Sequence, residues 1–125
     1  MGRNVKAERV RSMENTKRFE TLYRGKIIYA EVTQLDDGCH ILLTGGDRSH
    51  IGAVVVIDEY GTVHEIAVKG HKEKMIALDW AERIFRKRKE PVCVAAGIHF
   101  DHLTKAELVE VVDAIVRLRN MVEKG

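Results

Sequence analysis

Residues 26–44, KIIYAEVTQLDDGCHILLT, consist of two apolar runs on either side of an Asp-Asp-Gly turn. The runs cover Lys26 to Leu35 and Cys39 to Thr44, and they carry the β-branched and aromatic residues that favour strands. An Asp-Gly pair between two such runs readily supplies the positive φ that a hairpin turn needs. The sequence therefore predicts an antiparallel β-hairpin over these residues.

Two further strands are expected directly after this hairpin. The first is His50 to Asp58 (HIGAVVVID), and the turn Glu59-Tyr60-Gly61 leads into the second, Thr62 to Lys69 (TVHEIAVK). Consecutive strands joined by such short turns usually pair side by side and antiparallel. We therefore expect an antiparallel meander of four strands.

Two helices and one more strand complete the predicted order. His71 to Lys89 has apolar residues at helical spacing and ends before Pro91, and Val92 to Ile98 (VCVAAGI) suits a short buried strand. The last helix follows the capping box formed by Thr104 and Glu107. The order is ββββαβα, which predicts an α+β, two-layer fold with a mostly antiparallel five-stranded sheet and two helices.

The length of the chain, 125 residues, suits one domain. Residues 1–20 are highly charged and show no clear period, so we expect them to be an N-terminal extension without fixed structure. Residues 21–125 should then form a single α/β ligand-binding domain.

Composition excludes several classes of protein. The formal net charge is only +2, and the basic run Arg83 to Lys89 would end a helix, where cations complement the helix dipole, which argues against nucleic-acid binding. No apolar run approaches the length of a membrane span. Cys39 and Cys93 lie far apart inside apolar runs, without the spacing of a disulfide scaffold or a zinc module. We expect a reduced protein of the cytoplasm that binds neither nucleic acid nor membranes.

Strand direction predicts that three polar segments meet at one edge of the sheet. These segments are Thr44 to Gly52, Gly70 to Lys72 and Gly97 to His102, and they hold four of the six histidines. Antiparallel strands alternate in direction and each helix carries the chain back across the sheet, so all three segments fall at the same end. Ligand sites of α/β proteins commonly occupy such an edge.

The residue types at this edge suit an anionic ligand. Glycines allow close approach to backbone N–H groups, Arg48 and Lys72 supply positive charge, and two helix N-termini are expected nearby. The histidines could also bind a metal, but their spacings match no strong metal motif, so hydrogen bonding or proton transfer is favoured. No nucleophile motif is present, which favours binding over catalysis. The candidate site has no catalytic residue and consists of Gly45, Gly46, Asp47, Arg48, His50, Gly52, Gly70, His71, Lys72, Gly97, His99 and Asp101.

Three sequences in this chain resemble the prenylated-flavin chaperone family, the small LpdD-like subunits that accompany UbiD-type decarboxylases of the gallate decarboxylase kind. They are TGGDRSHIGAVVV at 44–56, GHKE at 70–73 and AGIHFDHLTKAE at 96–107. The resemblance spans about residues 24–122, and the charged N-terminal extension and His102 depart from the pattern.

The resemblance implies a non-catalytic protein that binds prenylated FMN, or FMN, and assists its delivery to, or maturation in, the decarboxylase. A flavin prenyltransferase is a further partner that it implies. The implied binding role falls on the glycines, histidines and aspartates of the candidate site. Ile51, Ile98 and Phe100 are candidates for an apolar wall against the flavin ring.

Two alternatives from other classes remain open at this point. One is a small metal-dependent enzyme that uses His50, His71 and His99, and the other is a scaffold subunit whose site edge binds protein. A homodimer is also expected, because Val54 and Val56 make the second face of their strand apolar and two helices cover only one face of a sheet.

Overall fold

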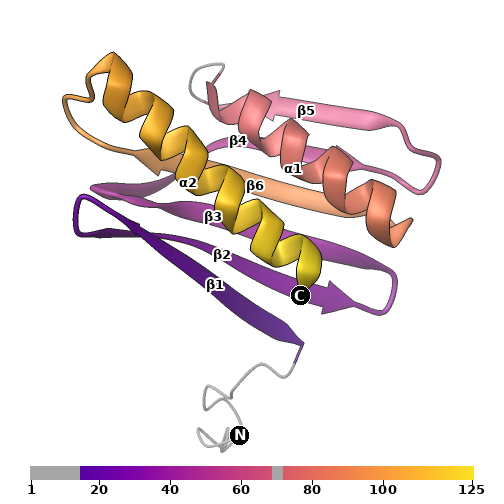
Figure 1. Cartoon of the computed structure of the whole chain (residues 1–125). Helices are drawn as coiled ribbons and strands as arrows, with labels where there is room; N and C mark the ends of the chain where they lie inside the picture. The colour runs from indigo at the N-terminus through magenta and orange to yellow at the C-terminus, as the bar shows by residue number, and fades with distance from the viewer. Residues whose placement is uncertain (1–14, 69–71) are drawn as a thin grey trace, which may run out of the picture.

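The computed structural model describes residues 15–68 and 72–125, which form a six-stranded mixed sheet with two helices on one face (Figure 1). The elements are β1 (Thr16–Tyr23), β2 (Lys26–Leu35), β3 (Gly38–Gly46), β4 (Arg48–Ile57), β5 (Val63–Ala67), α1 (Lys72–Arg88), β6 (Val92–His99) and α2 (Lys105–Lys124). The α+β fold class is thus confirmed, and all seven expected elements are present.

The elements that were predicted from short-range sequence patterns are present in the structure. β2 and β3 pair as an antiparallel hairpin, with Leu35 opposite Gly38, and β4 pairs antiparallel with β5. The capping box of α2 is present: the Thr104 hydroxyl accepts the Glu107 N–H at 3.1 Å, and the Glu107 carboxylate accepts the Thr104 N–H at 3.0 Å. Two N–H groups that the helix leaves free are therefore satisfied locally.

The sheet has one strand more than expected. β1 begins at Thr16 and pairs with β2, so Thr16 to Glu20 do not belong to an unstructured extension. As an edge strand, β1 pairs on one side only. Its exposed charged residues interrupt the alternation of apolar and polar residues by which a strand is recognised in a sequence. Phe19 and Tyr23 of this strand nevertheless pack against the core.

The predicted meander is wrong in the middle of the sheet, where the strand order is β1-β2-β3-β6-β4-β5. β6 lies between β3 and β4, parallel to the first and antiparallel to the second. The physical reason is that β6 is apolar on both faces and is best buried with a neighbour on each side. The turn from β3 to β4 passes over the end of β6, since Gly46 and Arg48 are both register partners of His99.

The core lies between the helices and one face of the sheet. α1 contacts β4, β5 and β6, whereas α2 contacts β1 and β2. The largest fully buried side chains come from both layers: Trp80, Ile28, Ile41, Leu43, Ile84, Leu118, Val55, Val92, Val94 and Val122. Within the described ranges, no element covers the opposite face of the sheet (Figure 1).

Candidate functional site

The end of β6 is the point where the predicted polar segments meet. The Asp47 N–H donates to the His99 carbonyl at 2.7 Å, so the turn after β3 is fixed to the end of β6. Segments 44–52 and 97–102 are therefore neighbours, as the strand directions predicted. Of the third segment, Gly70 and His71 lie outside the described residues, and Lys72 is the first residue of α1.

A buried hydroxyl group holds these segments in register. Thr44 is 3% exposed, and its Oγ1 donates to the Gly97 carbonyl at 2.7 Å and accepts the His50 N–H at 3.1 Å. The pairing of β4 with β6 is irregular between Ser49 and Ala53, so the regular ladder does not fix His50. The Thr44 side chain supplies the missing connection from β3 to β6 and, beyond it, to β4.

The glycines at this edge allow close approach of backbone to backbone. A Cβ at Gly45 would lie 2.2 Å from the Ile27 carbonyl oxygen, and one at Gly46 would lie 2.3 Å from that of His99. A Cβ at Gly97 would lie 2.0 Å from the His50 carbonyl oxygen. Gly45 and Gly46 also have positive φ angles of 136° and 86°. These three positions therefore require glycine for the fold of the site itself.

Two histidine–carboxylate pairs face each other at this edge. His99 Nε2 lies 2.8 Å from Asp101 Oδ1, and His50 Nε2 lies 3.5 Å from Glu73 Oε1. The two imidazole rings are 6.3 Å apart between centroids and nearly perpendicular, at 79°. Sequence reasoning missed Glu73, for which the only signal was its place in the GHKE motif. Gly52 makes room for it, because a Cβ there would lie 2.6 Å from Glu73 Cγ.

The Asp101 carboxylate is held in its ionised form. The hydrogen bond from His99 is the largest cause that lowers the pKa of Asp101 below its usual value, and the charges of His99, His102 and Arg48 lower it further. The backbone N–H of Asp101 donates to Asp47 Oδ2 at 2.9 Å, which fixes the loop. A fixed anionic partner leaves the remaining nitrogen of His99 free to meet a ligand.

A polar cavity and an apolar cavity adjoin at these pairs. The polar one has a volume of about 330 Å³ and is lined by Arg48, His50, Glu73 and His99. Glu73 and His99 also line the apolar one, of about 200 Å³, whose other lining residues include Ile98 and Phe100, two of the expected wall residues. The third, Ile51, is 52% exposed and lines neither cavity.

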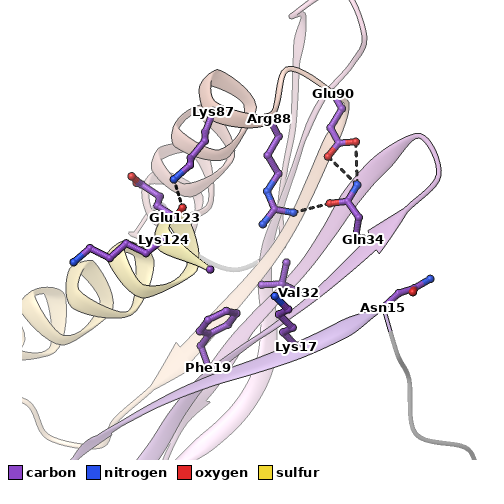
Figure 2. Close-up of a pocket in the computed structure, with 11 residues that line it drawn as sticks. Asn15, Lys17, Phe19, Val32, Gln34, Lys87, Arg88, Glu90, Glu123 and Lys124 are labelled. Carbon is purple, nitrogen blue, oxygen red and sulfur yellow. Dashed lines mark hydrogen bonds between the residues drawn. The ribbon is translucent and has the colours of Figure 1, made fainter.

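A larger cavity, of about 540 Å³, lies at the opposite edge, between β1, β2 and the last turns of both helices (Figure 2). Figure 2 shows that two of its basic side chains have local partners: Lys87 donates to the Glu123 carbonyl and Arg88 to the Gln34 side chain. Both helices end here, where their dipoles are negative. This cavity suits an anion less well than the histidine-lined one.

The site offers hydrogen-bond donors and positive charge at one end and apolar surface at the other. Arg48 and Lys72 are exposed cations at this edge. The start of α2, which we expected to attract an anion, is instead closed by its own capping box and carries the Glu107 carboxylate. Among residues 15–68 and 72–125, no three His, Cys, Asp or Glu side chains are placed to hold a metal ion. In the same ranges, no helix is both long and apolar enough to cross a membrane.

Comparison with known proteins gives one family. A family model described as "Prenylated flavin chaperone LpdD-like domain" matches residues 23–124, which include all three motifs quoted above. No curated protein matches the sequence significantly. Among solved structures, a chain from the crystal structure of a novel chaperone complex for yeast 20S proteasome assembly is similar, with a TM-score of 0.49 and 11% identity over 83% of this chain and 98% of that chain.

Proposed function

Since the chain belongs to the prenylated flavin chaperone LpdD-like family, we propose that it binds prenylated FMN at the edge formed by His50 and His99 and assists its delivery to a UbiD-type decarboxylase. The observation that carries this proposal is the cavity of about 330 Å³ lined by Arg48, His50, Glu73 and His99. It joins the Arg48 guanidinium and two imidazole rings in one place, next to an apolar cavity.

Each part of the flavin has a matching group at this edge. The phosphate meets the exposed cation Arg48, whose guanidinium can bind phosphate through two parallel hydrogen bonds. The flavin ring presents nitrogen and oxygen atoms to the ring nitrogens of His50 and His99. The hydrogen bond to Asp101 orients the His99 ring before the ligand arrives, and the Glu73 carboxylate faces the His50 ring at 3.5 Å.

The proposed role is binding and transfer, without chemistry on the flavin. A carrier has to release its cargo, and the polar cavity lies at an edge of the sheet, where the exposed Arg48 marks access from solvent. The partners that we propose are a UbiD-type decarboxylase, which receives the cofactor, and a flavin prenyltransferase, which makes it.

We further propose that a second copy of the chain covers the open face of the sheet. Leu42, Ala95, Val54 and Ile66 are register partners across β3, β6, β4 and β5, so they form an apolar strip on the face opposite the helices. Ile66 is 63% exposed, and soluble monomers rarely leave such strips uncovered. The β1–β2 side of this face carries both signs of charge, with Arg18 3.7 Å from Glu31. A face with an apolar strip and both charges suits self-association about a two-fold axis.

Co-production with a flavin prenyltransferase, followed by native mass spectrometry and absorbance, tests the flavin proposal. We expect the wild type to carry prenylated FMN, and His50→Ala and His99→Ala each to bind it about tenfold more weakly, as for the loss of one hydrogen bond of about 1.4 kcal/mol. The matched control is His64→Ala, because His64 makes a similar pair with Asp58 at 2.9 Å, at the far end of the sheet.

Three results would contradict the proposal. One is a wild-type protein that carries no flavin, and another is a pair of site variants that bind flavin as well as His64→Ala does. The third is loss of the fold in both site variants, which would make His50 and His99 structural residues. Unfolding midpoints recorded for all variants separate the third result from the others.

A further inference from the structure

We propose that the apolar cavity beside the histidines holds the five-carbon unit that distinguishes prenylated from unmodified flavin, so that this site selects the prenylated form. This inference rests on the proposed function, because it assigns one part of the same ligand to a second compartment. The residues that select the form are then the apolar residues that line this cavity, some from the segment Gly97 to His102 and others from α1 and α2.

The two cavities have contrasting walls and a common boundary. All four residues that line the larger one are charged or polar: Arg48, His50, Glu73 and His99. Apart from Lys72, Glu73 and His99, the smaller one is lined by apolar side chains from three regions of the fold. These apolar residues are Ile76, Ile98, Phe100, Leu103, Leu108, Val111, Val112 and Ile115. A ligand with a polar heterocycle and a hydrocarbon extension matches this division, whereas a wholly polar ligand uses only one compartment.

The volume of the apolar cavity fits a small hydrocarbon group. It measures about 200 Å³, and an apolar protein cavity of about 150 Å³ is known to accept benzene, which has six carbons. A five-carbon unit is of similar size. Unmodified FMN leaves this compartment without an apolar occupant, and it therefore loses the free energy of burying that unit.

The expected preference follows from the buried area. Each CH₂ group that is moved from water into an apolar site improves affinity about fourfold. If two or three of the five carbons are buried, the preference for prenylated over unmodified FMN is roughly 15-fold to 60-fold.

Two valines of α2 allow a matched test. Val112 lines the apolar cavity and is 42% exposed, so a polar side chain there changes the wall without entering the core. Val109 lies three residues earlier, is 60% exposed and lines none of the three cavities described above. Val112→Asn and Val109→Asn thus make the same chemical change inside and outside the proposed compartment.

The experiment measures the dissociation constants of FMN and prenylated FMN by titration calorimetry, for the full chain and both variants. We expect the wild type to prefer prenylated FMN at least tenfold. Val112→Asn should reduce that preference at least about threefold, close to the effect of one CH₂, with FMN affinity unchanged within twofold, and Val109→Asn should retain the wild-type preference. Circular dichroism confirms the fold, and Leu108→Ala replaces Val112→Asn if that variant unfolds.

Two outcomes overturn the inference while the proposed function stands. In one, the wild type binds both flavins equally well. In the other, a folded cavity variant changes the affinity for both flavins by the same factor, so that it keeps the same preference as Val109→Asn. A wild type that binds neither flavin contradicts the proposed function itself, and the inference falls with it.

Discussion

The Thr44 hydroxyl group connects three strands at the candidate site, and Thr44→Val removes it with almost no change of shape. In the wild type, this hydroxyl donates to the Gly97 carbonyl at 2.7 Å and accepts the His50 N–H at 3.1 Å. Thr44 is 3% exposed, so water has little access to replace either bond. Valine keeps the branched side chain and leaves the two backbone groups without this partner.

The size of the effect follows from these two bonds. A buried polar group that loses its partner costs about 1–3 kcal/mol, so the loss of two partners in Thr44→Val should destabilise the protein by about 2–6 kcal/mol. For a domain of about 100 residues, 1 kcal/mol lowers the unfolding midpoint by about 4 °C, which predicts a decrease of about 8–24 °C. Flavin binding should weaken as well, because the bulged segment that carries His50 loses its connection to β3 and β6.

Thermal unfolding followed by circular dichroism measures the first effect, and flavin absorbance titration measures the second. Thr44→Ser is the matched control, since it keeps the hydroxyl and removes only a methyl group. We expect Thr44→Ser to stay within about 1.5 kcal/mol of the wild type, as for the removal of one buried methyl group. Equal unfolding midpoints for Thr44→Val and Thr44→Ser would refute this role of the hydroxyl.

Three further predictions concern other parts of the fold. Gly97→Ala should lose at least about 2 kcal/mol of stability in chemical unfolding, because the new Cβ has to displace the His50 carbonyl; a wild-type midpoint would contradict this. The hydrogen bond from Arg83 is the largest cause that lowers the pKa of Glu123. The stability that the ionised Glu123 contributes is complete above the ordinary glutamate pKa of about 4.3 and is lost as the pH falls through the lowered pKa. The free energy of unfolding should therefore decrease more in the wild type than in Glu123→Gln over that acid range, and equal decreases in the two proteins would contradict this prediction. Val54→Lys should give a monomer mass in light scattering where wild type gives a dimer, and a monomeric wild type at micromolar concentration would exclude the proposed interface.

The sequence alone predicted the elements whose causes are local. The hairpin at residues 26–44 depends on alternation within a few residues and on an Asp-Gly turn, and α2 depends on a capping box that closes within three residues. The family motifs also lie within short segments, and the family model confirms them over residues 23–124. Strand direction then brought Asp47, His50, His99 and Asp101 to one edge, because direction follows from the order of elements alone.

Tertiary structure alone decided where β6 lies in the sheet. β6 separates β3 from β4 because a strand that is apolar on both faces is buried best between two others, and this pairing forms between residues far apart in the chain. The same long-range contacts explain why Gly97 cannot carry a side chain, why Glu73 reaches His50, and why an apolar cavity lies behind His99. Local sequence patterns do not contain these facts, since each depends on the distance between two segments that only the packed sheet and helices fix.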